Sequence, residues 1–415
     1  MLARKILSVL GQTLAGILVI FLGLLVVLLP LSTAVPAWIW IPLALADVGL
    51  IILPFRLKPT WRGVMVSLLG MIVVGLIAIF TSQVFAATPP ITGADGKPLS
   101  GSIAVLEKVM LNGSEQWITI RGHDTTKPVL LNLGMGGPGG GGFIQRTLFE
   151  PLENEFVVVS WDEPGTGKSY HAVPISSLTP ARFIEDAHAL TLYLQERFHQ
   201  EKIYVYGTSW TSILGIWLVQ QYPDLYHAYL GNAQMINTTE NDLMGYELAL
   251  KYSAERGDTK MVETLRRNGT PPYAGEGMLA KYVAFLDVLN DYMDAPRYTF
   301  VVPIAPFIAP EYGWVDKINH TRGLVESFEV VYPQLENLDF KTQAAKLEVP
   351  VYIFMGRDDV NAMPTLVEEY IAILEAPHKE LIWLEGGHGL DGSNLGQFVD
   401  VMVNKVLADT CPANK

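Results

Sequence analysis

Three side chains in this sequence could together activate a hydroxyl group for attack on a carbonyl carbon. They are Ser209, His388 and one of the two adjacent acids Asp358 and Asp359. A serine is a weak nucleophile until a base removes its proton, and that base must itself be oriented by a third group. We therefore predict acyl transfer by a Ser-His-Asp triad, in which His388 is the base and Asp358 or Asp359 is the orienting acid.

A glycine-rich loop at residues 134–142 could supply backbone hydrogen-bond donors for this reaction. Glycine has no Cβ atom, so its N–H group can approach a ligand closely. An oxyanion hole needs such donors, because negative charge develops on the carbonyl oxygen in the transition state. We expect the N–H groups of Gly137 and Trp210 to form this hole. A flexible surface turn is the alternative interpretation of the loop.

Each candidate follows an apolar run that predicts a β-strand. The predicted strands are 102–109, 116–121, 129–133, 156–161, 203–206, 226–230, 351–355 and 380–384. Helical patterns lie between the later strands, which favours a largely parallel sheet with helices on its faces and an antiparallel edge. Ser209 lies between a strand and a helical pattern, so it would stand on a sharp strand-to-helix turn. Ligands of such sheets bind beyond the carboxyl ends of the strands.

Several other functions are excluded by the sequence. The run 165–169 ends in Gly-Lys-Ser, but Asp162 stands where a phosphate-binding loop needs glycine, and Glu163 adds a second repelling carboxylate. The histidines show no metal-ligand spacing, so we expect neither a metal nor a cofactor. With a net charge of −13 and no basic face, nucleic acid is not an expected partner. Cys411 is the only cysteine, so no intramolecular disulfide forms.

The chain as a whole is too apolar for an ordinary soluble enzyme, and the excess of apolar residues lies before residue 87. Mean hydropathy is +0.27 and 17% of residues are charged. We predict a membrane domain over residues 1–87 with about three spans, at 6–31, 37–53 and 64–85. The second contains Pro42 and Asp47, so a re-entrant segment is its alternative. The lipid bilayer is therefore an expected partner.

Basic residues predict how these spans are oriented. They are Arg4, Lys5, Arg56, Lys58 and Arg62, located before the first span and between the second and third. Positive residues stay in the cytoplasm, so the chain after residue 88 should be extracytoplasmic in a multi-pass protein of the cell membrane. A signal peptide is short and single, which does not fit this pattern. Cleavage after Val84-Phe85-Ala86 is an alternative fate of the anchor.

From about Ser102 to Leu407 the sequence resembles an α/β-hydrolase of the proline iminopeptidase-like group. Five motifs carry the resemblance, in order: residues 135–139, 161–169, 207–212, 356–359 and 386–389. The resemblance implies an α/β-hydrolase fold, a mostly parallel sheet flanked by helices, with a helical cap. It also implies Asp359 as the acid of the triad, with Asp358 as the second choice. The core would comprise 102–233 and 349–410, the cap 234–348, and the linker from the membrane domain 88–101.

The sequence departs from the family pattern at three places. Met135 replaces a histidine, Glu163-Pro164 replaces Gln-Arg, and Thr211 replaces the glycine of the elbow motif. None of these changes removes a triad side chain. We expect Thr211 to widen the packing between strand and helix or to shift the elbow. The departures should alter substrate preference and rate more than fold.

The resulting prediction is a membrane-anchored serine hydrolase that cleaves amide or ester bonds of a small molecule or short peptide. The resemblance implies an aminopeptidase whose cap carboxylates bind the free amine of the substrate. The cap carboxylates available are Glu240, Asp242, Glu247, Glu276, Glu311 and Glu326. No motif selects among them. The alternatives are a membrane carboxylesterase or lipase and a non-catalytic scaffold with a hydrolase fold; the oligomeric state is unknown.

Overall fold

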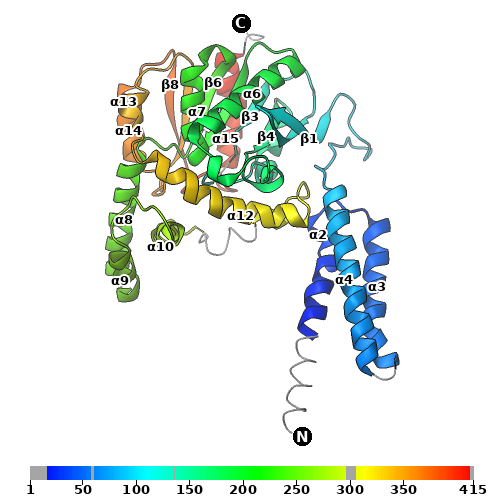
Figure 1. Ribbon diagram of the computed structural model, residues 1–415. Helices are drawn as coiled ribbons and strands as arrows, with labels where there is room; N and C mark the ends of the chain where they lie inside the picture. Colours follow the sequence, from blue (N-terminus) through cyan, green and yellow to red (C-terminus); the bar gives the residue numbers. More distant parts are fainter. Residues whose placement is uncertain (1–15, 58–59, 135, 296–304, 412–415) are drawn as a thin grey trace. The chain divides into compact units, whose positions relative to one another are not determined.

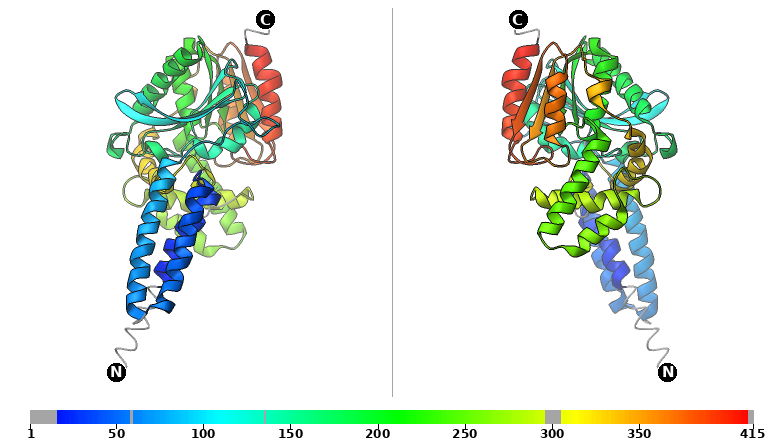
Figure 2. Two further views of the ribbon diagram at one scale, coloured as in Figure 1. Left: turned by 90° about the vertical axis from the view of Figure 1, so that its right-hand side faces the viewer. Right: turned by 90° about the vertical axis from the view of Figure 1, so that its left-hand side faces the viewer.

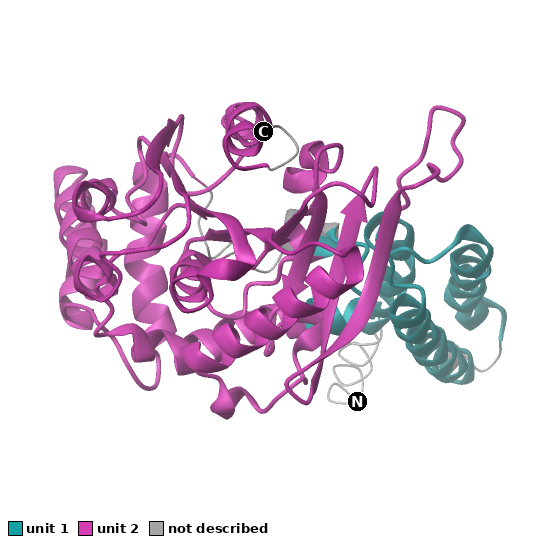
Figure 3. Ribbon diagram, turned by 90° about the horizontal axis from the view of Figure 1, so that it is seen from above, with its two compact units in different colours: residues 1–89, 307–318 teal, residues 90–306, 319–415 magenta. Residues whose placement is uncertain are grey.

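A computed structural model describes residues 16–57, 60–134, 136–295 and 305–411 of the chain. Its internal contacts divide it into two compact units (Figure 3). The first comprises Met1–Pro89 and Phe307–Ile318, and the second comprises Pro90–Pro306 and Asn319–Lys415. Met135 of the predicted glycine loop lies outside the described residues, as do the first residues of the predicted span 6–31.

The first unit contains two helices that are long and apolar enough to cross a membrane. They are α3 (Ala37–Arg56) and the part Trp61–Val84 of α4 (Thr60–Val84). Within the described residues, the expected number of about three spans is thus corrected to two. The described part of the predicted first span is a shorter apolar helix, Gly16–Val27, followed by the four-residue α2 (Leu29–Ser32). Pro30 lies in the first turn of α2, and proline there starts a helix rather than continuing one.

The surfaces of α3 and α4 are apolar. Trp38, Phe55 and Phe80 are respectively 70%, 78% and 68% exposed. Pro42 lies within α3, which is one continuous helix and not a re-entrant pair. The segment 307–318, inside the predicted cap, contacts the end of α4 within this unit: the N–H of Trp314 donates to the Ser82 hydroxyl at 3.0 Å.

The second unit is built on one eight-stranded sheet (Figure 1). Its strands are β1 (Ile103–Leu111), β2 (Ser114–Gly122), β3 (Val129–Asn132), β4 (Val157–Asp162), β5 (Ile203–Thr208), β6 (Tyr226–Asn232), β7 (Val351–Gly356) and β8 (Lys379–Leu384). The order is β1-β2-β4-β3-β5-β6-β7-β8. Pairing is antiparallel at β1/β2 and β2/β4 and parallel from β4 to β8. The prediction of a mostly parallel sheet with an antiparallel edge is confirmed.

Alternating side chains of the strands enter two apolar cores, one on each face of the sheet. Leu131 and Val205 face the layer of α6 (Pro180–Phe198), α7 (Trp210–Gln221) and α14 (Pro364–Ile373), whereas Leu130 and Tyr204 face the other layer. The second layer consists of α5 (Arg146–Phe149), α15 (Leu395–Val401) and α16 (Leu407–Thr410). Figure 2 shows these layers on opposite sides of the sheet. Burial on both faces explains the continuous apolar runs of the central strands.

Between β6 and β7 the chain forms a set of helices with an apolar cluster of their own. They are α8 (Thr238–Glu255), α9 (Thr259–Asn268), α10 (Met278–Tyr292) and α12 (Trp314–Val331), and the short α13 (Phe340–Gln343) follows. Aromatic rings join α10 to α12, with the centroids of Tyr282 and Phe328 5.4 Å apart. In Figure 1 these helices lie along the lower edge of the sheet. We call α8, α9, α10 and the part of α12 from residue 319 the cap helices.

Candidate active site

Ser209 stands on a sharp turn between β5 and α7. Its backbone has φ 54° and ψ −120°, a conformation that costs a non-glycine residue free energy and persists only where the surroundings impose it. The turn is tight because Gly207 has no side chain: a Cβ atom there would lie 2.3 Å from the carbonyl oxygen of Thr211. The strained turn therefore projects the Ser209 hydroxyl beyond the carboxyl end of β5.

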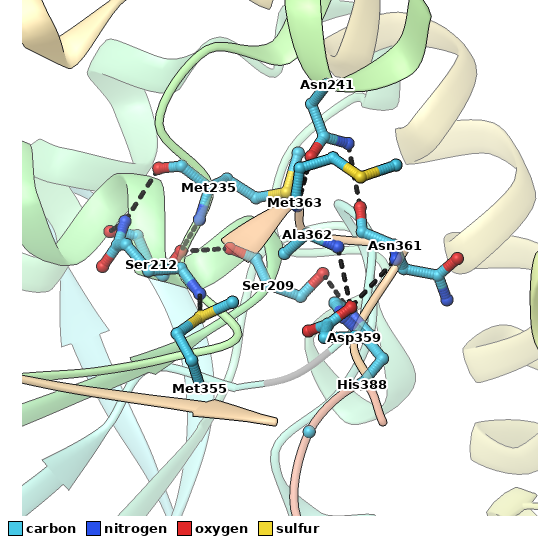
Figure 4. A network of polar contacts seen from close by, with 12 residues as sticks. Ser209, Ser212, Met235, Asn241, Met355, Asp359, Asn361, Ala362, Met363 and His388 are labelled. Atoms are coloured by element: carbon cyan, nitrogen blue, oxygen red, sulfur yellow. Dashed lines mark hydrogen bonds and ion pairs between the residues drawn. The ribbon is translucent and has the colours of Figure 1, made fainter. Parts of the chain in front are cut away.

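The structure brings Ser209, His388 and Asp359 together in one row (Figure 4). Nε2 of His388 lies 3.1 Å from the hydroxyl oxygen of Ser209. Nδ1 of the same ring lies 2.9 Å and 3.1 Å from the two carboxylate oxygens of Asp359. Asp358, the second choice for the acid, is exposed and takes no part in this row.

Backbone donors hold the Asp359 carboxylate in place. The N–H groups of Asn361 and Ala362 each donate to one of its oxygens at 2.9 Å, and the side chain is fully buried. Burial lowers the pKa of His388, but the negative charge of Asp359 and its hydrogen bond outweigh burial, so the pKa lies above its ordinary value. The contact with Asp359 thus makes the His388 imidazole more basic, so it accepts a proton more readily.

Ser209 and His388 open into a cavity of about 410 Å³. Gly137 and Trp210, the residues predicted to form the oxyanion hole, line the same cavity. The cap helices supply an apolar wall to it, formed by Leu279, Val283, Leu286, Leu324, Val325 and Phe328. A substrate carbonyl in this cavity would therefore meet polar groups on the side of the sheet and hydrocarbon on the side of the cap.

The glycine loop is packed tightly on both sides, which makes a flexible surface turn the wrong interpretation. A Cβ atom on Gly139 would lie 2.4 Å from the carbonyl oxygen of Gly323 in α12. A Cβ atom on Gly323 would in turn lie 2.2 Å from the carbonyl oxygen of Gly165. Close backbone contacts of this kind require glycine, and they hold the loop against α12.

Thr211, which replaces the family glycine, is fully buried at the start of α7. Its hydroxyl donates to the carbonyl oxygen of Gly134 at 2.9 Å and accepts from the N–H of Thr208 at 2.9 Å. We expected this side chain to widen the packing or shift the elbow. Instead, the hydroxyl ties the elbow to the glycine loop, while Gly207 allows the close approach.

Among the six cap carboxylates of the sequence analysis, Asp242 lines the cavity into which Ser209 and His388 open. Its side chain accepts a hydrogen bond from the Tyr332 hydroxyl at 2.9 Å, and burial raises its pKa to about 7. The others have other surroundings: Glu247 and Glu276 are exposed, Glu240 pairs with Lys341, Glu326 pairs with Arg322, and Glu311 belongs to the other unit. No sequence pattern distinguishes Asp242, because its position depends on how the cap helices pack.

A metal centre is not part of the described site. Within residues 16–57, 60–134, 136–295 and 305–411, no three side chains of His, Cys, Asp or Glu come together in a way that could hold a metal ion.

Comparison with known proteins agrees with this architecture. No protein-family model matches the chain. The probable aminopeptidase YbaC of Bacillus subtilis (strain 168) is 28% identical over 292 residues, which are 69% of this chain and 91% of that protein.

Two solved structures are similar in fold. A proline iminopeptidase from Mycobacterium smegmatis is 15% identical with a TM-score of 0.54, over 74% of this chain and 99% of that one. A proline iminopeptidase-related protein from Thermus thermophilus is 19% identical with a TM-score of 0.53, over 75% of this chain and 99% of that one. Together with the strand order, these similarities show that the second unit has the α/β-hydrolase fold.

Proposed function

We propose that this protein is a serine hydrolase in which Ser209, His388 and Asp359 form the catalytic triad. The observation that carries the proposal is the hydrogen-bonded row from the Ser209 hydroxyl through His388 to Asp359. A nucleophile within hydrogen-bond reach of a base, with the base oriented by an acid, is the arrangement that acyl transfer requires. The row also opens into a cavity large enough for a small substrate.

In the first half of the reaction, Nε2 of His388 takes the proton of Ser209 as the serine oxygen attacks the substrate carbonyl. Asp359 holds the ring in the tautomer with the proton on Nδ1 and stabilises the positive charge that forms. The N–H groups of Trp210 and Gly137 donate to the oxyanion, where one such donor contributes about 3 kcal/mol. His388 then gives its proton to the leaving group, and an acyl-enzyme remains on Ser209.

In the second half, a water molecule attacks the acyl-enzyme. His388 takes a proton from this water and returns it to the Ser209 oxygen as the acyl group departs. The net reaction is hydrolysis of one amide or ester bond. Trp210 and Gly137 stabilise the second oxyanion in the same way as the first.

We further propose that the substrate carries a free amine next to the cleaved bond, as an aminopeptidase substrate does. Two observations support this: Asp242 is a carboxyl group in the wall of the catalytic cavity, and the similar protein of Bacillus subtilis is named an aminopeptidase. A substrate ammonium beside Asp242 would favour the ionised carboxylate and pair with it. Tyr332 already orients the group by donating to it.

A carboxylesterase or lipase is the second candidate, favoured by the apolar cap wall. Hydrocarbon side chains from α10 and α12 would accept an acyl chain without needing a charge on the substrate. Rates on proline or alanine naphthylamides and on short acyl esters distinguish the two candidates. An aminopeptidase should cleave the naphthylamides with the higher kcat/KM, and N-acetylation of those substrates should abolish their cleavage.

We also propose that α3 and α4 anchor the enzyme in the cell membrane, with the basic connection between them (Arg56, Lys58 and Arg62) in the cytoplasm and the hydrolase unit on the extracytoplasmic side. Their exposed apolar side chains support insertion in lipid, because the core helix of a soluble protein would bury them. Alkaline carbonate washing should leave the protein with the membrane. Protease added to intact cells should remove the hydrolase unit, and a protected unit would reverse the proposed orientation.

The triad is tested by replacing its nucleophile. Full-length protein in detergent should react with a fluorophosphonate probe at Ser209, and Ser209→Ala should remove both this labelling and turnover of an activated ester. The thermal unfolding midpoint serves as a control for folding of the variant. Ester turnover that persists in folded Ser209→Ala would refute the assignment.

A further inference from the structure

Glu163 is a buried carboxyl group that the reaction above does not use. It follows directly after β4 and is fully buried. The indole N–H of Trp210 donates to one carboxyl oxygen at 3.3 Å, and the backbone N–H of Gly139 is close enough to lower the pKa of the carboxyl group. A buried acid is unfavourable unless it has such partners, so its presence calls for an explanation.

These two partners belong to the two halves of the proposed oxyanion hole. Trp210 follows the nucleophile and supplies one backbone donor. Gly139 lies in the glycine loop two residues after Gly137, which supplies the other. Within this loop the N–H of Gly140 donates to the carbonyl oxygen of Gly137 at 2.9 Å, so the position of Gly139 is coupled to that of Gly137.

Thr211 makes a parallel connection between the same two segments. Its hydroxyl donates from the first turn of α7 to the carbonyl oxygen of Gly134, at the beginning of the glycine loop. Glu163 and Thr211 thus join the elbow to the loop at two points. Both residues are departures from the family pattern, which has glutamine and glycine in these places.

We propose that Glu163, assisted by Thr211, is a positioning residue that fixes the separation of the two backbone donors in the oxyanion hole. The inference rests on the proposed function, because it concerns a step of that reaction. A donor contributes fully only when it lies about 3 Å from the place where the charge develops. The two connections set this geometry before substrate binds.

The charge state of Glu163 fits this role. Burial raises its pKa to about 8, against the hydrogen bonds of Trp210 and Gly139, and the negative charge of nearby Asp162 raises it further. The loop residues 136–142 and the first turn 209–212 of α7 contain no ionisable acid or base side chain. At neutral pH Glu163 is therefore mainly protonated, and it adds no negative charge of its own beside the oxyanion. Ionisation above about pH 8 would introduce one.

The experiment measures kcat and KM of full-length protein in detergent, with p-nitrophenyl acetate as the substrate and fluorophosphonate labelling to count active sites. Glu163→Ala should lower kcat per labelled site about tenfold to hundredfold with KM changed less than about threefold, because the oxyanion forms only in the transition state. Glu163→Gln keeps an acceptor for both donors and should retain most of kcat at pH 7. It should also remove the fall in kcat above about pH 8.

Thr211→Val and Thr211→Ser provide a second pair. Valine matches the shape but lacks the donor, so it should lower kcat, whereas serine restores the hydroxyl and should rescue it. Glu153→Gln is the matched control, since Glu153 is equally buried and paired with Arg121 at 2.6 Å outside the catalytic cavity. It should lower thermal stability and leave kcat per labelled site unchanged.

Unchanged kcat in labelled, folded Glu163→Ala would overturn the inference about Glu163 and leave the proposed function untouched. If Glu163→Ala does not fold, the pH profile of Glu163→Gln decides: a fall above pH 8 that persists in this variant would also overturn the inference. Loss of kcat in Glu153→Gln as large as in the Glu163 variants would show a merely structural effect. Wild-type protein that lacks labelling at Ser209 would overturn the proposed function itself.

Discussion

The two walls of the catalytic cavity differ in how they are built. The core wall consists of strand ends and tight turns, where Ser209, His388 and Gly137 are held by backbone geometry and hydrogen bonds. The cap wall consists of helix faces, where hydrocarbon side chains and the carboxyl group of Asp242 line the cavity. The same substrate would touch both walls at once.

This difference suggests separate roles for the two walls: the core wall for the reaction and the cap wall for substrate recognition. In the proposed reaction, groups on the core wall would act on the carbonyl of any substrate that reaches them, so they would determine the type of reaction. The cap wall would contact the rest of the substrate, so it would determine which molecules are accepted. A change on the core wall should therefore affect all substrates equally, whereas a change on the cap wall should discriminate between them.

The largest effect is expected on the core wall, at Asp359. Asp359→Asn leaves the shape nearly intact but favours the wrong tautomer of His388, and kcat should fall about 10⁴-fold. The loss should be the same for an amine substrate and for an ester. Asp358→Asn is the matched control, and it should retain activity because Asp358 is exposed. Equal losses in the two variants would show that the acid of the triad has been misassigned.

Next in size is a change on the cap wall. Asp242→Asn removes the charge that would pair with an ammonium group, and kcat/KM for alanine or proline naphthylamide should fall about tenfold to hundredfold. Short acyl esters carry no ammonium, so their kcat/KM should change less than about threefold. A loss shared by both substrates would remove the distinction between the walls and favour a structural role for Asp242.

The pH dependence of the two substrate classes should differ as well. His388 must be neutral to act as the base, so kcat/KM for an ester should fall about tenfold per pH unit below its raised pKa. For an amine substrate Asp242 must also be ionised, and it becomes protonated as the pH falls through about 7. The acidic limb should then approach a slope of two in a plot of log kcat/KM against pH. Identical limbs would argue against amine binding at Asp242.

The smallest effect is expected from Tyr332→Phe. This change removes a hydrogen bond that favours the ionised form of Asp242, so the pKa of Asp242 should rise further. At pH 7 KM for an amine substrate should increase about threefold, and the difference should vanish near pH 9, where Asp242 is ionised in both proteins. Steady-state kinetics at the two pH values test this, and ester hydrolysis provides the internal control.

The sequence predicted the core wall better than the cap wall, because the core depends on local patterns. Each strand of the sheet is an apolar run bounded by turns, and Ser209, Asp359 and His388 follow three of these runs directly. Parallel strands place their carboxyl ends at one edge of the sheet, so short segments far apart in sequence are brought together by a regular rule. The choice between Asp358 and Asp359 followed from the resemblance of the turn 356–359 to the acid turn of the proline iminopeptidase-like group.

What the sequence did not predict depends on contacts between distant segments. The hydrogen bond from Thr211 to Gly134 joins residues 77 positions apart, and no pattern within either segment indicates it. Asp242 is selected from six carboxylates only by the packing of the cap helices.

The stack of Gly139, Gly323 and Gly165 limits how this enzyme can be redesigned. Exchange of the cap for that of another hydrolase would alter substrate choice only if the incoming helix also places a glycine against the loop at the position of Gly323. Mutant libraries aimed at new substrates should therefore vary the hydrocarbon faces of α10 and α12 and keep these three glycines fixed. The same contacts constrain α12 at Gly323, although this helix belongs to the part of the fold proposed to determine substrate choice.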